Sequence, residues 1–386
     1  MQILRKDLDA LLISNPTNIR YLTGFVSAAP QEREAYVLVA TNAMYLFTNS
    51  LYLEQAKEII PASLAGRQLS PAEQDLALPD NNQINTNYPI KLLEISRIKP
   101  LTNRLSEIFE SEFSQKQVKL GFESNDLTVA EYTQIKRKLA DVQLVATQNL
   151  IEQQRILKTG QEITSIKKAC AITDACFDAI LKKIKPGISE TELTWEIETF
   201  FRKNGAESSF SPIVAFNENS SQPHYTPSSR FTLNASPSLI LLDFGARFNG
   251  YCADMTRMVH FGNPPEKIRN TYQALRSAQE KAVTLLASGE RSGAKLDAAA
   301  RKILTQHNLP EYPHSLGHGI GLDIHEAPRL TIRQNEELKP GMVFSIEPGI
   351  YFEGKFGMRL EDLVLINEKN EIEVLTKSAK MFTLIT

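Results

Sequence analysis

The segment LILLDFGARFNGYCADMTR, residues 239–257, combines two strand-like runs, a turn and two acidic side chains. Leu239–Leu242 is a short apolar run typical of a buried strand. Phe248-Asn249-Gly250 indicates a turn, because Asn and Gly tolerate the positive φ that a tight hairpin requires. The segment therefore predicts a β-hairpin in which Asp243 and Asp254 lie on opposite sides of the turn.

The centre of this turn decides how the two aspartates face each other. If it is Asn249-Gly250, Asp243 lies opposite Thr256, and Asp254 is its diagonal neighbour. If it is Phe248-Asn249, the two aspartates lie directly opposite. Either register places both carboxylates on one face, within about 4.5–8 Å of each other. Like charges at that distance repel, and a divalent cation would relieve the repulsion; the alternative is a pair of solvated strand carboxylates.

Length and composition predict a soluble protein of two domains. A chain of 386 residues is long for one core, and 42% hydrophobic with 23% charged residues is ordinary for a globular protein. The net charge of −2 argues against nucleic acid or an anionic membrane as the main partner. Three scattered cysteines favour a reducing compartment, and we find no signal peptide and no apolar run long enough for a membrane span. We therefore expect a cytoplasmic protein.

The pattern along the chain changes near residue 150. Residues 1–150 alternate strand-like and helical patterns around an irregular segment at 61–90, which predicts a smaller α/β domain. Glu152–Lys185 has continuous helical spacing, which predicts one helix that leads into the second domain. Residues 151–386 then predict antiparallel sheet packed against helices, an α+β arrangement.

The histidines and two further acidic residues gather in the second half of the chain. All six histidines lie at or after position 224, and PHSLGHGIGLDIHEAP (residues 313–328) holds three of them. Glu347 and Glu361 are symmetric about Gly354 in a plausible second hairpin, which would place them opposite each other. Four carboxylates with one or more imidazoles are typical of a two-metal hydrolytic site. An oxygen-rich ligand set favours Mn²⁺, with Co²⁺ or Zn²⁺ as alternatives.

The sequence resembles the pita-bread metallopeptidases, a family that includes methionine aminopeptidase, prolidase and aminopeptidase P. The N-terminal part, with NPTNIRYLTGF and LYLEQA, resembles the creatinase-like domain of prolidases and aminopeptidases P, which short methionine aminopeptidases lack. The resemblance over about residues 155–386 rests on five segments: SPIVAFNENSSQPHY, LLDFGARFNGYCADMTR, HSLGHGIGLDIHEAP, FSIEPGIY and GMRLEDLVL.

The resemblance implies a set of metal ligands. Asp243 would bind one metal ion, and His318 with Glu347 would bind the other. Asp254 and Glu361 would each bridge the two ions from opposite sides.

The resemblance also implies catalytic roles around these ligands. Glu347 would carry a proton, and His224 and His325 would hydrogen-bond the scissile amide and the tetrahedral intermediate. His314 matches an additional active-site histidine of the proline-directed members. Arg359 would either hold an acidic side chain in place or bind a substrate carboxylate.

The predicted function is an Xaa-Pro aminopeptidase acting through a metal-bridging hydroxide on proline-containing peptides. The alternatives are an Xaa-Pro dipeptidase (prolidase), a creatinase-like non-peptidase, and a methionine aminopeptidase, which the N-terminal domain disfavours. The resemblance implies a homodimer. Two departures from the family pattern, TNSLY at 48–52 and Phe216 in AFNEN, affect the expected shape of the substrate pocket but not the metal ligands.

Overall fold

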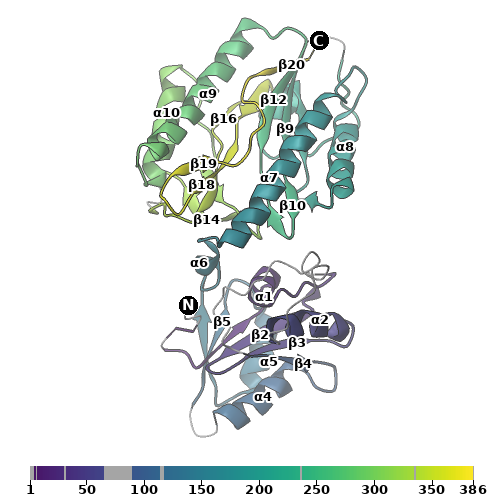
Figure 1. Ribbon diagram of the computed structural model, residues 1–386, viewed down its shortest axis with the longest axis vertical. Helices are drawn as coiled ribbons and strands as arrows, with labels where there is room; N and C mark the ends of the chain where they lie inside the picture. Colours follow the sequence, from purple (N-terminus) through teal and green to yellow (C-terminus); the bar gives the residue numbers. More distant parts are fainter. Residues whose placement is uncertain are drawn as a thin grey trace. The chain divides into compact units, whose positions relative to one another are not determined.

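The computed structural model describes residues 4–5, 7–29, 32–64, 89–113, 117–234, 237–333 and 336–385 (Figure 1). The chain divides into two compact units, Met1–Arg155 and Ile156–Thr386. Most of the segment predicted to be irregular, 61–90, lies outside the described residues. In the part that is described, no helix is both long and apolar enough to cross a membrane.

The first unit is a six-stranded mixed sheet with helices on both faces (Figure 1). The strand order is β4-β3-β2-β1-β5-β6, with antiparallel pairing of β2 to its two neighbours and parallel pairing elsewhere. Helices α4 and α5 pack against one face of the sheet. The elements are β1 (Ala10–Ile13), α1 (Pro16–Thr23), β2 (Ala35–Ala40), β3 (Met44–Thr48), α2 (Leu53–Leu64), β4 (Ile90–Glu94), α4 (Leu101–Glu112), β5 (Lys119–Glu123), α5 (Val129–Lys138), β6 (Gln143–Thr147) and α6 (Glu152–Arg155). The predicted α/β organisation is confirmed.

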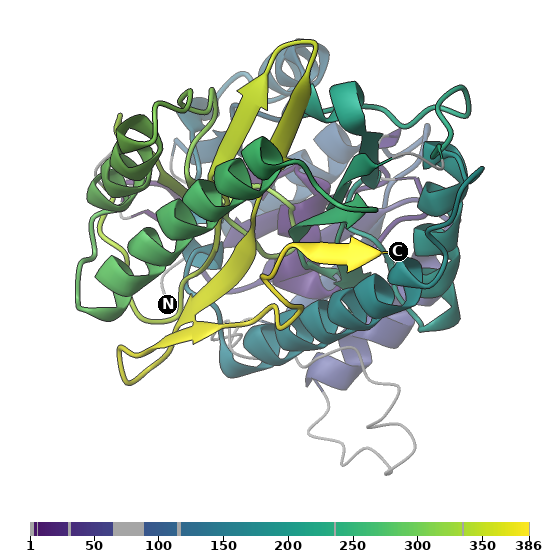
Figure 2. The ribbon, with the colours of Figure 1, turned by 90° about the horizontal axis from the view of Figure 1, so that it is seen from above.

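The second unit consists of two similarly built halves, each with two helices and a mostly antiparallel sheet; the C-terminal strand β20 joins the sheet of the first half in parallel to β12 (Figure 2). The first half contains α7 (Gly160–Leu181), α8 (Glu190–Lys203), β7 (Glu207–Ser208), β8 (Ile213–Phe216), the 3₁₀ helix η2 (Asn217–Ser221), β9 (Ser238–Asp243), β10 (Ala246–Phe248), β11 (Tyr251–Cys252) and β12 (Thr256–Phe261). The second half contains α9 (Glu266–Ala287), α10 (Gly293–Gln306), β13 (Gly317–Gly319), β14 (Glu326–Leu330), β15 (Val343–Ile346), β16 (Gly349–Phe352), β17 (Phe356–Arg359), β18 (Asp362–Ile366), β19 (Ile372–Val374) and β20 (Thr383–Ile385).

Two clusters of buried apolar side chains form the hydrophobic core of the second unit. Helices α7 and α8 pack on strands β8, β9 and β12 through one cluster of buried apolar side chains. Helices α9 and α10 pack on the other faces of these strands and on the strands of the second half through another. The strand orders are β20-β12-β9-β8 and β14-β13-β15-β18-β19, so the α+β arrangement predicted for this part of the chain is confirmed.

The predicted continuous helix over Glu152–Lys185 is wrong at its N-terminal end. Helix α6 ends at Arg155, and α7 begins only at Gly160. Thr159 is the reason for the restart, because its side chain accepts from the backbone N–H of Glu162, whose carboxylate in turn accepts from the N–H of Thr159. This capping box fixes a new helix start and interrupts the helical pattern that the apolar spacing suggests.

The first hairpin has the register set by Asn249-Gly250. Strand pairing places Asp243 opposite Thr256, as the first of the two predicted registers requires. Asn249 and Gly250 have φ values of 50° and 83°, the left-handed conformation of a tight hairpin turn. The register continues unbroken from the turn to the base, because Phe248 pairs with Tyr251 in the same frame.

The second hairpin is symmetric about Gly354, as predicted. Phe352 pairs with Phe356 next to the turn, and Ile346 pairs with Asp362 further along. Gly354 has φ 64°, which a glycine adopts without strain. Glu347 follows Ile346 and Glu361 precedes Asp362, so this strand register brings the two glutamates to facing positions.

We predict that Gly245→Ala destabilises the second unit. A Cβ atom at Gly245 would lie 1.8 Å from the carbonyl oxygen of Ala253 on the facing strand, so the hairpin would have to open. The expected loss is about 1–3 kcal/mol or more of unfolding free energy, measured by urea denaturation. Gly160→Ala is the control: nothing lies within 4 Å of its Cβ, and stability should stay equal or rise by up to about 1 kcal/mol. Equal stability of the two variants would contradict the prediction.

Candidate metal centre and active site

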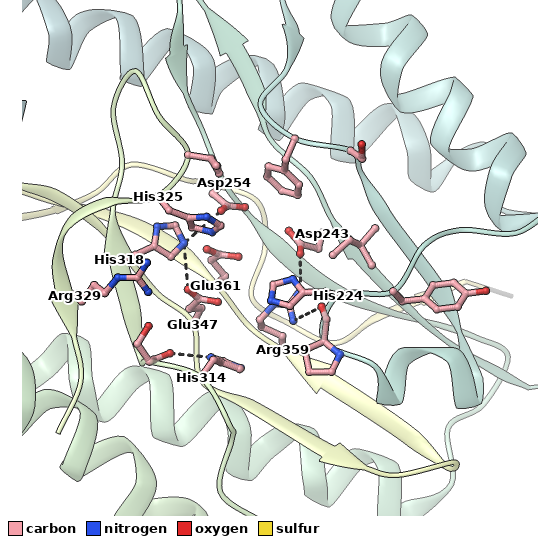
Figure 3. Close-up of a pocket in the computed structure, with 17 residues that line it drawn as sticks. His224, Asp243, Asp254, His314, His318, His325, Arg329, Glu347, Arg359 and Glu361 are labelled. Atoms are coloured by element: carbon pink, nitrogen blue, oxygen red, sulfur yellow. Dashed lines mark hydrogen bonds and ion pairs between the residues drawn. The ribbon is translucent and has the colours of Figure 1, made fainter. Parts of the chain in front are cut away.

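The ends of the two hairpins and the loops beside them line one cavity of about 460 Å³ (Figure 3). Acidic residues come from the hairpins, and histidines come from the segment after α10 and from the loop before β9. The structure brings all nine predicted site residues into this lining: His224, Asp243, Asp254, His314, His318, His325, Glu347, Arg359 and Glu361.

One imidazole and three carboxylates converge on one side of the cavity (Figure 3). His318 Nε2 lies 3.7 Å from Asp254 Oδ2 and 3.3 Å from Glu347 Oε1. Single ligand atoms of Asp254, His318 and Glu361 all lie within 4.8 Å of one another. Asp243 lies across the cavity beside Arg359, with which it forms a buried ion pair.

Burial and mutual repulsion make the charged forms of these carboxylates costly. The pKa of Asp254 is raised well above its ordinary value by burial and by the charges of Glu361 and Asp243. Burial and neighbouring carboxylates likewise raise the pKa of Glu361, and burial raises that of Glu347. Bound divalent cations would stabilise the ionised forms.

Unpartnered oxygens support the fit to metal ions. Asp243 Oδ1, Asp254 Oδ1 and Glu361 Oε1 are buried and have no hydrogen-bond partner within the described residues. A buried carboxylate oxygen without a donor is costly unless a cation meets it. The donor set therefore fits hard divalent ions, because four of its five members supply oxygen.

The protonation state and hydrogen bonding of His318 suit a neutral metal ligand. Burial lowers its pKa to about 4, so the ring is uncharged at neutral pH. Nδ1 lies 3.1 Å from the carbonyl oxygen of Gly319, which fits a tautomer with the proton on Nδ1. Nε2 then carries a lone pair directed toward Asp254 and Glu347.

Ser345 fixes the backbone and side chain next to this imidazole. Its hydroxyl accepts from the backbone N–H of His318 at 3.0 Å and donates to Glu347 Oε1 at 3.1 Å. Gly317 is required here, because a Cβ atom would lie 1.8 Å from the carbonyl oxygen of Ser345. The two proposed ligands of one ion are thereby linked through a single buried hydroxyl.

Arg359 is fully engaged by protein groups. Its guanidinium pairs with Asp243 and donates to Thr256 Oγ1 at 3.0 Å and to the Tyr351 hydroxyl at 2.8 Å. Thr256 Oγ1 in turn donates to Glu361 Oε2 at 2.8 Å. These contacts fit the first predicted role of Arg359, which is to hold an acidic side chain in place, and leave little of the guanidinium for a substrate carboxylate.

The three other histidines that line the cavity differ in how much of the ring is free. His314 is engaged at both nitrogens: Nδ1 lies 2.8 Å from the Ser315 carbonyl oxygen, and Nε2 lies 3.1 Å from the Tyr351 hydroxyl. Part of the His325 residue is exposed, but the loss of solvent around its ring and the neighbouring His318 lower its pKa to about 4; the two ring centroids lie 4.5 Å apart in an edge-on arrangement. His224 is exposed, and its ring has no hydrogen-bond partner among the residues the structure describes. His224 and His325 are therefore free to meet a substrate.

Four functional neighbours were not singled out from the sequence. Arg329 lines the cavity from β14, directly opposite His318 in the strand register. Thr256, Ser345 and Tyr351 bond to the ligands or to Arg359. The last three lie inside the segments that carry the family resemblance, so that resemblance contained the signal.

Comparison with known proteins identifies the family. The model of metallopeptidase family M24 matches residues 164–368, and the creatinase/prolidase N-terminal domain matches residues 2–157. The chain belongs to metallopeptidase family M24. This confirms the family and the enzyme class inferred from the five segments, together with the creatinase-like N-terminal domain and the pita-bread fold. Members of this family depend on a pair of metal ions.

The relatives of this M24 peptidase match over nearly the whole chain. An uncharacterised peptidase of Bacillus subtilis is 34% identical over 375 residues, which is 97% of this chain and 95% of the relative. The structure of an Xaa-Pro dipeptidase from Bacillus anthracis matches with a TM-score of 0.82 at 32% identity, covering 98% of this chain and 95% of the other. The structure of an X-Pro aminopeptidase from Thermotoga maritima matches with a TM-score of 0.81 at 28% identity, covering 98% of both chains.

We predict that Asp254→Asn abolishes the stabilisation by Mn²⁺ without destabilising the metal-free protein. In the metal-free M24 peptidase the variant should unfold at the same or a higher temperature than the parent, because one of several repelling charges is gone. Saturating Mn²⁺ should raise the melting temperature of the parent but not that of the variant. At about 100-fold excess over Kd, a bound ion adds about 2.7 kcal/mol to the unfolding free energy. Asp178→Asn, on the exposed face of α7, should keep the full increase. A Mn²⁺-induced increase in Asp254→Asn as large as in the parent would refute this ligand.

The stabilisation by Mn²⁺ should grow with pH. Carboxylates whose pKa is raised in the fold stabilise the metal-free protein at acidic pH, and this contribution is lost as the pH rises through their raised values. Mn²⁺ needs the deprotonated forms, so protons compete with it over the same interval. We expect a larger Mn²⁺-induced rise in melting temperature at about pH 7.5 than at about pH 5.5. A rise that does not depend on pH would show that these carboxylates do not bind the metal.

Proposed function

We propose that the protein is a metal-dependent Xaa-Pro peptidase whose two divalent ions are held by Asp243, Asp254, His318, Glu347 and Glu361. The observation that carries this proposal is the convergence of three buried carboxylates, the partly buried Glu347 carboxylate and one neutral imidazole on one cavity. The names of two structural relatives, an Xaa-Pro dipeptidase and an X-Pro aminopeptidase, support the substrate class. The oxygen-rich donor set favours Mn²⁺, with Co²⁺ and Zn²⁺ as alternatives.

The chemistry of proline explains what the site must do. An Xaa-Pro bond is a tertiary amide without an N–H, and its leaving nitrogen must gain a proton when the bond breaks. Bound metal ions would supply Lewis acidity and lower the pKa of a water molecule. Glu347 lines the cavity and is the least buried of the four carboxylates, so its carboxyl group is placed to transfer a proton to the prolyl nitrogen. His224 and His325 present free ring edges that would hydrogen-bond the carbonyl oxygen and the amide.

The surroundings of Arg329 indicate which length of substrate peptide the cavity would prefer. Its side chain lines the cavity, and none of the described residues forms a hydrogen bond or an ion pair with it. A free guanidinium is well suited to binding a carboxylate, and the carboxylate of a dipeptide lies on the prolyl residue itself. Arg359 cannot take this role as readily because Asp243, Thr256 and Tyr351 occupy it. Although the sequence favours an aminopeptidase, Arg329 leads us to propose dipeptidase activity, with the Xaa-Pro aminopeptidase as the second candidate.

We predict that the Mn²⁺-loaded protein hydrolyses Ala-Pro faster than Ala-Pro-Ala. Arg329→Gln should lower kcat/KM for Ala-Pro about 10- to 100-fold, mainly through KM, because a charge-assisted hydrogen bond contributes about 1.5–3 kcal/mol. Arg333→Gln is the matched control, since this exposed arginine lies four residues further along and does not line the cavity.

Other outcomes select other functions. Preferred cleavage of Ala-Pro-Ala after alanine, with Arg329→Gln unchanged, would establish the aminopeptidase. Binding of Mn²⁺ without cleavage of either peptide would exclude both Xaa-Pro activities and favour a creatinase-like non-peptidase.

A further inference from the structure

A carboxylate outside the metal cavity collects four hydrogen bonds from the loop that carries His224. Glu190 is the first residue of α8 and is 0% exposed. Its Oε1 accepts from the backbone N–H of Phe216 at 2.8 Å and from Asn219 Nδ2 at 2.9 Å. Its Oε2 accepts from the hydroxyl of Tyr225 at 2.7 Å and from the backbone N–H of Ser228 at 3.2 Å. All four donors lie between residues 216 and 228, and none belongs to α8.

The far end of the same loop returns to the segment before α8. Glu190 donates its backbone N–H to the carbonyl oxygen of Phe231 at 3.2 Å. Leu233 exchanges backbone hydrogen bonds of 2.8 Å with Ile188 and Gly187. The loop 216–233 is therefore closed at both ends on residues 187–190, with the Glu190 carboxylate inside it.

This closure determines where His224 stands. The imidazole makes no hydrogen bond of its own to described residues, so its position depends on the backbone on either side. On one side, the carbonyl oxygen of Pro223 accepts from Arg359 Nη1 at 3.3 Å. On the other side, Tyr225 is held by Glu190, and both His224 and Tyr225 line the cavity.

We propose that Glu190 is a positioning residue of the active site, whose buried carboxylate fixes the loop 216–233 so that His224 and Tyr225 face the metal ions and the substrate. This proposal rests on the proposed peptidase function and deepens it. A carboxylate at a helix N-terminus is favoured by the helix dipole even when it is exposed, so stabilising α8 does not require Glu190 to be fully buried. Its two oxygens, however, can accept four donors in a defined geometry, which an apolar contact cannot do.

The decisive variant is Glu190→Gln, which preserves volume but leaves one oxygen to accept four donors. We expect kcat/KM for Ala-Pro to fall about 10- to 100-fold, mainly in kcat, because displacing a catalytic group by about 1 Å has effects of this size. The Mn²⁺-induced rise in melting temperature should equal that of the parent, because no metal ligand is touched. Glu198→Gln, an exposed position of the same helix, is the control and should match the parent in both measurements. A kcat/KM for Glu190→Gln equal to that of the control would overturn the proposal.

A double-mutant cycle separates positioning from a general loss of stability. If Glu190 acts through His224, adding Glu190→Gln to His224→Ala should lower kcat/KM much less than it does in the parent. An undiminished loss in the His224→Ala background would overturn the proposal. All assays are made well below the melting temperature of the least stable variant.

A measurement without turnover keeps this proposal distinct from the proposed function. The chain has six histidines, so the His224 ring resonance can be assigned in the metal-free protein by comparison with His224→Ala. We expect Glu190→Gln to shift or broaden this resonance, and Glu198→Gln to leave it unchanged. Failure of the parent to cleave any Xaa-Pro peptide would refute the peptidase alone, whereas an unchanged His224 resonance in Glu190→Gln would refute the positioning role.

Discussion

The repulsion among four carboxylates gathered at one cavity, three of them buried, is the constraint on which the catalytic unit depends. Asp243, Asp254, Glu347 and Glu361 come from the bases of two hairpins, and burial together with their mutual repulsion raises the pKa values of the last three. In the metal-free protein this concentration of charge is destabilising, and only tightly packed hairpins with fixed registers keep it in place. The fold would therefore hold the proposed ligands in advance, and metal binding would recover the free energy that their repulsion costs.

A second layer of buried charges holds the hairpins against each other. Arg257, which follows Thr256 on β12, pairs with Asp362 at 2.7 Å, and both side chains are almost completely buried. Asp362 follows Glu361, so this ion pair lies immediately behind the metal cavity and joins one hairpin to the other. Arg359 joins them again from the opposite direction through Asp243 and Thr256. Loss of one partner of such a buried pair costs about 3–5 kcal/mol, so the geometry of the metal site and the stability of the unit are linked.

Around this rigid centre, the groups available to a substrate are those that the protein leaves free. His224, His325 and Arg329 line the cavity, and their polar atoms are not occupied by the described residues. His314 and Arg359 also line it, but their polar atoms are already bonded to Ser315, Tyr351 and Asp243. The division between occupied and free groups separates residues that support the site from residues that would contact a peptide. Glu190 extends the supporting group to a side chain outside the cavity.

The sequence by itself predicted the two hairpins and, with the family resemblance, the proposed ligand set. Asn249-Gly250 and Gly354 define turns, and a turn fixes the register of the strands on both sides of it through hydrogen bonds between near neighbours in the chain. The facing positions of Glu347 and Glu361 follow from that local geometry, whereas the sequence allowed two registers for the first hairpin, and the structure chose the one that pairs Asp243 with Thr256. Local patterns failed where a cap competed with them: Thr159 starts a new helix within a segment whose apolar spacing predicts a continuous one.

Only the tertiary structure decided how these local pieces act together. The contact of Arg359 with Asp243 spans 116 residues, and those of Glu190 with its loop span 26 to 38. No periodicity encodes such contacts, because they form only when separate apolar cores bring the helices and the two hairpins into register. The same packing decides which guanidinium is occupied and which is free, so Arg359 and Arg329 cannot be told apart by residue type. Their different surroundings arise from long-range packing, which the order of residues specifies only through the complete fold.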